Sequence, residues 1–475
     1  MTGGLMQLVA YGAQDIYLTG NPMITYFKVV YRRHTNFAME SIEQTFNFEP
    51  SLGTKVSSLI ARNGDLIAGV YVRSTLPSIE GDGGRWIDNV GHYLLKSVEI
   101  DIGGQPIDKH YSDWLEIWSQ LTVPAGQKVG YLEMIGQDPV DAFDRLTGLQ
   151  ADVKDGVITG RTIFVPLQFW FCRNEGLALP LIALQYHEVK IHVEFDTLAN
   201  LTRGTPTVVG TGSISDTSLW VDYIYLDTDE RRRFAQISHE YLIEQLQYNS
   251  ESLLCNSNRS NTLTTHTVNL NFNHPVKELV WFIRNDQSLQ VLDRQPANYT
   301  SVRATDVITQ SATNAIGGLS TTTGLSAIAK QDQLLELIGQ SSIDPPGAKN
   351  PIVTAKLKLN GHDRYGTRGG DYFNLVQTQV HTCVPESPGI NVYSFALEPE
   401  NHQPSGACNF SRIDKAQLIF TASVLTTTVD DRVNYPGVHS TQQAYTNGNS
   451  KIHIYAHSYN VLRIMSGMGG LAYSY

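Results

Sequence analysis

The sequence is poor in the features of secreted, metal-bound or membrane-spanning proteins. Its four cysteines stand far apart, and no two of them form a C-x-x-C spacing: Cys172, Cys255, Cys383 and Cys408. This usage indicates neither a disulfide framework nor a zinc site, and it fits a reducing compartment. No charged-then-apolar signal peptide opens the chain, and no apolar run approaches the ~20 residues of a membrane helix. We therefore expect a soluble protein that stays outside the secretory pathway.

Positive charge is scarce as well. The 35 Lys and Arg residues face 46 Asp and Glu residues, which gives a net charge of −11 at pH 7. Binding to a phosphate backbone requires clustered cations, so a broad nucleic-acid interface is not expected. The one basic run, Arg231 to Arg233, is flanked by Asp227, Asp229 and Glu230. We interpret it as part of a solvated linker.

Motifs of catalysis and cofactor binding are missing. The sequence has no G-x-S-x-G, no H-E-x-x-H and no His-x-His. GMGGLA (467–472) fits a relaxed dinucleotide fingerprint, but it leaves no room for the helix that would bind the pyrophosphate. GHDRYGT (361–367) has the glycine spacing of a phosphate loop but carries Thr367 where lysine is required. The sequence thus predicts no enzyme, no catalytic residue and no cofactor.

Two histidine pairs come closest to a metal site. His187 and His192 are five positions apart, and His453 and His457 are four apart. Two imidazoles that share one face of a strand would be two positions apart. We interpret all four as ordinary strand residues and predict no metal.

What the sequence does contain is the same succession of strands and turns, twice. Two-residue turns typical of β-hairpins join apolar runs at Asn63-Gly64, Gly103-Gly104 and Asn360-Gly361. Eight strand candidates, lettered B to I, occur in the same order in each half. In the first half they are 36–46, 54–62, 65–76, 97–102, 105–109, 162–171, 185–195 and 218–227. In the second half they are 240–248, 264–272, 276–284, 353–359, 362–365, 391–398, 412–422 and 451–462. The pattern predicts an all-β chain with two tandem eight-stranded modules.

Residue periodicity supports these assignments. Val189, Ile191 and Val193 alternate with polar residues, which predicts a strand with one buried face. Helical spacing occurs at 330–339 and at 110–121, where we expect Trp114 and Trp118 to pack in a core.

The connections between strands fall into two groups. If successive strands run antiparallel, the D–E, F–G and H–I links of both halves lie at one end of the modules, and these are the long ones. Tight turns and both termini then lie at the opposite end, which we call the base. Much of 305–350, in the second D–E link, consists of Ser, Thr, Gly, Ala and Gln. It is either a surface loop or a disordered insert, since each doubling of loop length costs only ~0.6 kcal/mol.

Four Asn-x-Ser/Thr sequons are present, at Asn200, Asn258, Asn298 and Asn409. The first three fall in links at the long-loop end and the fourth in the G–H link at the base. Without a secretory route, chance occurrence is the expected explanation.

Long blocks of the sequence carry a family resemblance. The opening MTGGLMQLVAYGAQDIYLTGNPMITYFKVVYRRHTNFAMESIEQTF (1–46) is followed by EIDIGGQPIDKHYSDW (99–114), NEGLALPLIALQYHEVK (174–190), WVDYIYLDTDERRRFAQ (220–236) and YNVLRIMSGMGGLAY (459–473). These blocks resemble the major capsid proteins of large icosahedral nucleocytoplasmic DNA viruses, in particular their chlorovirus-like branch. The chain departs from that family mainly in the long loops 118–160, 285–352 and 425–450.

The resemblance implies a double jelly roll, with an N-terminal segment (1–30) at the base, a first jelly roll (31–227), a linker (228–236) and a second jelly roll (237–475). It also implies a homotrimeric, pseudo-hexagonal capsomer that tiles an icosahedral virion shell after synthesis in the host cytoplasm. Minor capsid and penton proteins, and an inner membrane that the chain does not span, would face the base. The segment 1–30 is then either a clamp to these inner partners or a strap on its own jelly roll.

Two other functions are compatible with stacked β-sheets. A glycan-binding or glycan-processing double β-sandwich is one, although 305–350 contains no Trp, Tyr or Phe to stack on sugars. A jelly-roll metalloenzyme of the cupin type is the other, and the missing His-x-His disfavours it.

Overall fold

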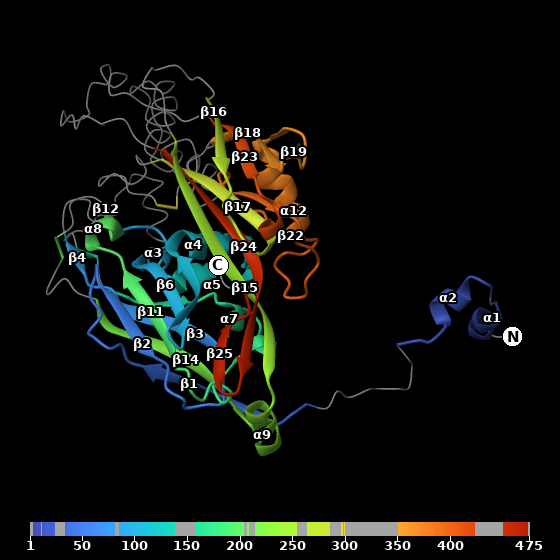
Figure 1. Ribbon diagram of the computed structural model, residues 1–475, viewed down its shortest axis with the longest axis horizontal. Coiled ribbons are helices and arrows are strands. Elements are labelled where there is room, and N and C mark those ends of the chain that lie inside the picture. Colours follow the sequence, from blue (N-terminus) through green and yellow to red (C-terminus); the bar gives the residue numbers. More distant parts are fainter. Residues whose placement is uncertain are drawn as a thin grey trace, which may run out of the picture.

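The computed structural model describes residues 3–10, 12–23, 34–80, 85–137, 157–158, 160–203, 207–208, 214–253, 264–285, 296–297, 299, 350–422 and 450–473. Strands dominate these ranges, and the helices are short (Figure 1). The predicted helix over 330–339, nearly all of 305–350, Asn258 and Asn298 lie outside them.

The first half of the chain forms two facing sheets, which together are the first jelly roll. One sheet has the order β1 (Phe37–Gln44), β14 (Ser215–Leu226) and β3 (Leu66–Thr75), and β9 (Thr162–Pro166) and β10 (Leu179–Pro180) both pair with β3. The other has the order β2 (Lys55–Leu59), β11 (Val189–Phe195), β6 (Leu95–Ile102) and β7 (Gln105–Tyr111). In strand letters these orders are B-I-D-G and C-H-E-F, the arrangement of a jelly roll.

The second half repeats the same orders. Its B-I-D-G sheet consists of β15 (His239–Leu253), β24 (Ser450–Met465), β17 (Pro275–Asn285) and β21 (Asn391–Ser394). Its C-H-E-F sheet consists of β16 (Thr264–Asn269), β23 (Ala416–Ala422), β18 (Ile352–Leu359) and β19 (His362–Asp363). Three short strands extend these sheets: β20 (Arg368–Gly369), β22 (Cys408–Asn409) and β25 (Met468–Leu471). The predicted duplication and the all-β double jelly roll are confirmed.

Alternation along the strands fills each jelly roll with apolar side chains. Val189, Ile191 and Val193 of β11 are all buried, and the residues between them are half-exposed. On β23 of the second jelly roll, Leu418 and Phe420 are buried in the same alternating manner. Each such side chain contributes about 1.5–3 kcal/mol on burial, so a few per strand hold the two sheets together.

The long connections of the first jelly roll meet at one end, as predicted. The D–E, F–G and H–I links each supply one strand of a small sheet: β4 (Ile79–Glu80), β8 (Val157–Ile158) and β13 (Thr207–Val208). A second small pairing joins β5 (Arg85–Trp86) of the D–E link to β12 (Thr202–Arg203) of the H–I link. In the second jelly roll, Asn285 pairs with Ser450 and Ile352 with Ala422, so the strand ends from which the long links leave also lie together.

The short connections lie at the base. Phe37 pairs with Leu226 and His239 with Ile464, so the first residue of strand B lies beside the end of strand I in both halves. Helix α9 (Thr228–Gln236) joins the jelly rolls there, and Figure 1 shows it at the lower tip. Arg231 of α9 forms an ion pair with the buried Asp65, with 2.9 Å between Nε and Oδ1. The solvated linker of the prediction is thus a helix tied to the first jelly roll.

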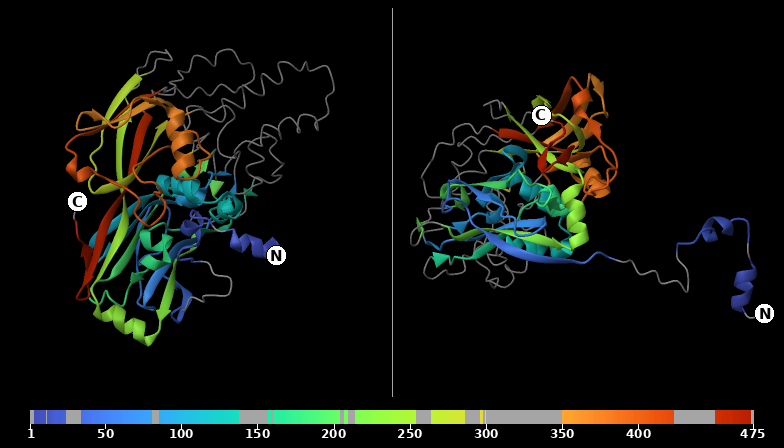
Figure 2. Two further views of the ribbon diagram at one scale, coloured as in Figure 1. Left: turned by 90° about the vertical axis from the view of Figure 1, so that its right-hand side faces the viewer. Right: turned by 60° about the horizontal axis from the view of Figure 1, so that its bottom comes forward.

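The other helices of the described ranges are short, and all except the N-terminal α1 and α2 lie in links between strands. They are α1 (Gly3–Val9), α2 (Asp15–Thr19), α3 (Val90–Leu94), α4 (Ser112–Thr122), α5 (Ala125–Met134), α7 (Trp170–Arg173), α8 (Leu198–Leu201) and α12 (Gln377–His381), with single turns η1 (Glu175–Leu177), η3 (Tyr372–Val376) and η4 (Phe410–Arg412). Helices α1 and α2 stand apart from both jelly rolls (Figures 1 and 2), and their apolar side chains, including Leu8 and Tyr17, are exposed. None of the helices in the described ranges has the length and apolar character needed to cross a bilayer.

Two of the predicted turns are hairpins and one is not. Gly103-Gly104 and Asn360-Gly361 adopt positive φ and connect paired strands. At Asn63-Gly64 the predicted hairpin is wrong, because β2 pairs with β11 in one sheet and β3 with β14 in the other. A Cβ on Gly64 would lie 2.7 Å from Cβ of Tyr223, so glycine permits close packing at this point.

Several strand candidates were too long. The first G candidate (162–171) ends as a strand at Pro166, and α7 begins at Trp170. The second (391–398) ends at Ser394. Proline cannot donate a ladder hydrogen bond, which explains the first of these early ends.

Candidate functional site: the interface between the two jelly rolls

Helix α4, in the F–G link of the first jelly roll, lies between the two jelly rolls (Figure 1). The predicted helix over 110–121 is therefore confirmed, and its tryptophans are core residues as expected. Leu115 packs into the core of the first jelly roll. Trp114, Ile117, Trp118 and Leu121 pack instead against the outer face of the second jelly roll's B-I-D-G sheet.

The contacts of α4 on that sheet are aromatic. The ring of Trp114 lies 5.4 Å from Tyr455, and Trp118 meets His457 edge-on at 5.5 Å. Tyr455 in turn packs on Tyr248, at 5.0 Å. Aromatic pairs at such distances add about 0.5–1.5 kcal/mol each beyond the area that they bury. The two jelly rolls are thus joined by a hydrophobic core of their own.

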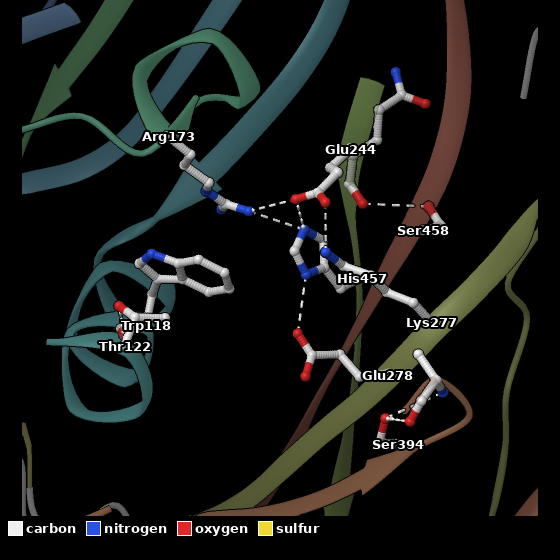
Figure 3. A network of polar contacts seen from close by, with 11 residues as sticks. Trp118, Thr122, Arg173, Glu244, Lys277, Glu278, Ser394, His457 and Ser458 are labelled. Atoms are coloured by element: carbon white, nitrogen blue, oxygen red, sulfur yellow. Dashed lines mark hydrogen bonds and ion pairs between the residues drawn. The ribbon is translucent and has the colours of Figure 1, made fainter. Parts of the chain in front are cut away.

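A network of charged groups borders this core (Figure 3). The Glu244 carboxylate on β15 accepts hydrogen bonds from Lys277 Nζ at 2.6 Å and from Arg173 of α7 at 2.9 Å. Nε2 of His457 lies 3.1 Å from Glu244, and its Nδ1 lies 2.9 Å from Glu278. The Arg173 guanidinium also stacks over Trp118, 3.7 Å from the ring centroid. Arg173 therefore connects the first jelly roll to the charges of the second and to α4.

Arg173 and Lys277 are the cations of this network, and Glu244 and Glu278 are its carboxylates. Burial alone would raise the pKa of Glu244, but His457, Lys277 and Arg173 outweigh it and hold that pKa well below its usual range. Burial lowers the pKa of Lys277, and the attraction of Glu244 and Glu278 opposes this shift. Two cations then face two carboxylates. Buried pairs of this kind add little net stability, but leaving one member unpaired is costly, so they favour one relative position of the jelly rolls.

A second ion pair joins α4 to the neighbouring jelly roll. Arg284 on β17 donates through Nη1 to Asp113 Oδ2 at 2.8 Å and through Nη2 to Oδ1. Its Nη2 also donates to the carbonyl of Pro296, at 3.0 Å. The paired side chains are 12% and 9% exposed. This two-pronged contact fixes the orientation of α4 as well as its position.

The opposite side of α4 is held by a third polar cluster. The Glu116 carboxylate lies 2.7 Å from His92 Nδ1 and accepts hydrogen bonds from Asn89 and Gln120, both at 3.0 Å. Burial would raise the pKa of Glu116, but His92 reverses this and lowers it. Gln120 also accepts a hydrogen bond from the backbone N–H of Ser387 in the second jelly roll. One helix thus carries hydrogen bonds to both halves of the chain.

Strand contacts complete the interface toward the base. The backbone N–H of Leu246 donates to Asp108 at 3.1 Å, and His187 Nδ1 lies 2.9 Å from the carbonyl of Gly469. A Cβ on Gly469 would lie 2.6 Å from Leu184. The glycines of GMGGLA (467–472) therefore allow β25 to pack closely on the first jelly roll.

The histidines and sequon asparagines singled out in the sequence lie in different parts of the structure. His192 lies on β11, 3.7 Å from Asp101, whereas His453 and His457 both lie on β24 in the interface. Asn200 lies in α8 and Asn409 in β22, and both are exposed. The ranges that the structure describes hold no group of three or more His, Cys, Asp or Glu side chains placed to bind a metal ion.

Sequence reasoning missed the network around Glu244. Its members come from positions 173, 244, 277, 278 and 457, so no local spacing connects them. One signal was available, because Lys277 and Glu278 interrupt the apolar strand VKELVWFIR (276–284). Adjacent charges inside a buried strand indicate a partner from elsewhere in the fold.

Comparison with known proteins agrees with this architecture. Residues 25–227 match the family described as "Major capsid protein N-terminus", and residues 230–470 match "Large eukaryotic DNA virus major capsid protein". The major capsid protein of Phaeocystis pouchetii virus is 45% identical over 548 residues, with all of both chains covered. That of Paramecium bursaria Chlorella virus 1 is 42% identical over 481 residues, again with full coverage of both.

Solved structures show the same relationship. A crystal structure of PBCV-1 VP54 matches with a TM-score of 0.72 and 37% identity, covering 95% of this chain and 100% of that one. The Faustovirus major capsid protein shares the fold, with a TM-score of 0.67 at 14% identity, covering 97% of this chain and 96% of that one. The relatives support a structural capsid role and not the glycan-binding alternative. With both halves matched by family models and full-length relatives above 40% identity, the chain belongs to the major capsid proteins of large eukaryotic DNA viruses.

Proposed function

We propose that this protein builds the virion shell as a homotrimeric, pseudo-hexagonal capsomer and that it has no catalytic role. One observation carries the proposal: two jelly rolls of identical strand order are joined by a buried interface into one block. Three such blocks around a threefold axis give six similar units. When head-to-tail contacts close into a ring, both contact surfaces of every subunit are occupied. A nearly sixfold outline then allows each capsomer to have six neighbours in an icosahedral lattice.

The two ends of the block have different proposed roles. The long-loop end faces outward. The base, with α9 and the tight turns, faces minor capsid and penton proteins and an inner membrane that the chain does not span. The exposed apolar side chains of α1 and α2 support a clamp to such inner partners more than a strap on the chain's own jelly roll. The proposed division is an N-terminal segment (1–30), a first jelly roll (31–227), a linker (228–236) and a second jelly roll (237–475), made in the host cytoplasm and assembled into the capsid.

The test is the mass of the purified protein, measured by light scattering coupled to size exclusion. A trimer of the 52.7 kDa chain has a mass three times as large, about 158 kDa. We expect this mass to persist on dilution, because a closed ring loses two contacts when one subunit leaves. A protein that stays at the monomer mass at every concentration would refute the capsomer.

A further inference from the structure

The C-terminal end of α4 is held by a segment of the second jelly roll, residues 383–387. The backbone N–H of Cys383 donates to the carbonyl of Leu121 at 3.1 Å, and the backbone N–H of Ser387 donates to Gln120 Oε1 at 3.2 Å. Both acceptors belong to α4, in the F–G link of the first jelly roll. These two hydrogen bonds therefore join the two halves of the chain at one place.

Glu400 lies beside this segment, in the G–H link of the second jelly roll. Its Oε1 atom is buried and has no hydrogen-bond partner in the part of the chain that the structure describes, and the same holds for Oε2 of Glu278. Glu278 is 1% exposed and is the charged residue with the largest effect on Glu400. Two buried carboxyl groups thus repel each other through oxygens that no donor satisfies, which is costly when both are ionised.

Glu400 also adds a third carboxyl group to the network around Glu244. The cations of that network, Lys277 and Arg173, both already donate to Glu244. Burial and the negative charge of Glu278 raise the pKa of Glu400 from 4.5 to about 8, and the two cations only partly oppose this shift. The arrangement therefore favours a proton on Glu400 over a third buried negative charge.

One hydrogen-bond donor connects Glu400 to the contact with α4. The Cys383 N–H that bonds to Leu121 also acts as a donor toward the Glu400 carboxyl. An ionised carboxylate is a stronger acceptor than a neutral carbonyl or carboxyl oxygen. A negative charge on Glu400 therefore competes with Leu121 for this N–H.

The remaining titratable groups at this place come from two elements. The Cys383 thiol lies beside Glu400, and burial raises its pKa above the usual value, so the thiol stays neutral near pH 7. Lys128 of α5 acts on that thiol and forms an ion pair with Glu386, with 2.6 Å between Nζ and Oε1. This ion pair is a further link between the first jelly roll and segment 383–387.

We propose that Glu400 is a proton switch for the contact between the two jelly rolls. With its proton, Glu400 is neutral and the Cys383 N–H stays on Leu121. When the proton passes to solvent, the carboxylate repels Glu278 and takes the Cys383 N–H, and segment 383–387 separates from α4. The block of two jelly rolls is then firm at acidic pH and looser toward alkaline pH. The switch lies within one chain, so it does not depend on the proposed trimer.

The direction of the pH effect follows from the two forms of Glu400. In the closed form its pKa is about 8, and in the open form the solvated carboxyl returns toward its ordinary value of 4.5. Opening therefore releases a proton at pH values between these two. The equilibrium constant for opening should rise by up to about tenfold per pH unit across this interval and level off above it.

Hydrogen–deuterium exchange of the full-length protein, followed by mass spectrometry, measures this opening. The readout is the protection of the backbone amides of 383–390, corrected for the pH dependence of the intrinsic exchange rate. We expect protection to fall from about pH 5 to about pH 8 by up to about tenfold per unit and then to become constant. The Glu400→Gln variant cannot release this proton, so its protection should not change with pH.

Two further variants make the test specific. Glu398 lies two residues before Glu400 in the same link and is exposed, so Glu398→Gln should keep the wild-type pH dependence. Glu278→Gln removes a negative charge that raises the pKa of Glu400. Glu400 then loses its proton at lower pH in the closed form, so the fall in protection should end at lower pH than in the wild-type protein.

Three results would overturn the proposal. Protection of 383–390 that is constant from about pH 5 to about pH 8 in the wild-type protein would show that no proton controls this contact. A fall that persists in Glu400→Gln would assign it to another group, such as His457. If Glu400→Gln does not fold, an unchanged end of the fall in Glu278→Gln refutes the role of this pair. A wild-type protein that is monomeric refutes the capsomer and leaves the switch intact, so the two proposals fail separately.

Discussion

Removing one member of the buried Asp113–Arg284 pair should destabilise the protein far more than removing both. The two side chains are only 9% and 12% exposed, so solvent cannot replace either partner. Arg284→Met leaves the Asp113 carboxylate buried and unpaired between the jelly rolls. Breaking a buried pair in this way costs about 3–5 kcal/mol, whereas apolar replacement of both partners is often neutral.

Urea unfolding, followed by circular dichroism, measures this difference. We expect Arg284→Met to lower the free energy of unfolding by about 3–5 kcal/mol. The double variant Asp113→Leu/Arg284→Met should lose at least ~2 kcal/mol less than the sum of the two single variants, because neighbouring residues of one ion pair are not additive.

An exposed ion pair of the same chemistry serves as the control. Arg463 and Glu240 lie 2.8 Å apart with side chains 50% and 59% exposed. Arg463→Met should change the free energy of unfolding by no more than ~1 kcal/mol. A loss below ~1 kcal/mol for Arg284→Met, or additive costs in the double variant, would show that the interface does not depend on this pair.

Two further predictions concern a turn and a titrating group. Gly103 and Gly104 both adopt positive φ, but a Cβ on Gly103 would lie 2.5 Å from the His187 ring, whereas a Cβ on Gly104 would meet no atom within 4 Å. Gly103→Ala should therefore lower the urea midpoint clearly more than Gly104→Ala does. Equal midpoints would contradict this prediction. Burial, aided by the negative charge of Glu278, raises the pKa of Glu400 from 4.5 to about 8. The folded protein then keeps a proton that the unfolded chain releases, so stability should fall as the pH rises from about 4.5 to 8, by at most ~1.4 kcal/mol per pH unit. Glu400→Gln should remove this slope, measured as the free energy of unfolding at several pH values, and an unchanged slope would assign it to another group.

Local sequence patterns predicted most of the strands, because alternation of apolar and polar residues and turn conformation depend on a few neighbouring residues. Alternation in 185–195 predicted the buried face of β11, and positive φ at Gly103-Gly104 and Asn360-Gly361 is a property of those residues themselves. Asn63-Gly64 shows the limit of such patterns. A turn signal predicts that the chain reverses, but the pairing of β2 and β3 depended on which sheet each strand joined.

The sequence predicted only parts of the interface between the two jelly rolls. Trp114 and Trp118 were expected in a core because their spacing is helical, but sequence could not tell that this core lies between two jelly rolls. His457 was interpreted as an ordinary strand residue, since its contacts with Glu244, Glu278 and Arg173 come from three other elements.

By itself, the sequence determined the two sets of strands, their common order and the separation of long links from short ones, because period-2 alternation and turn residues act over a few neighbouring positions. Only the tertiary structure decided which charges meet and which aromatic face α4 covers. Those outcomes depend on desolvation and packing between segments that are hundreds of residues apart, where no sequence spacing carries the information.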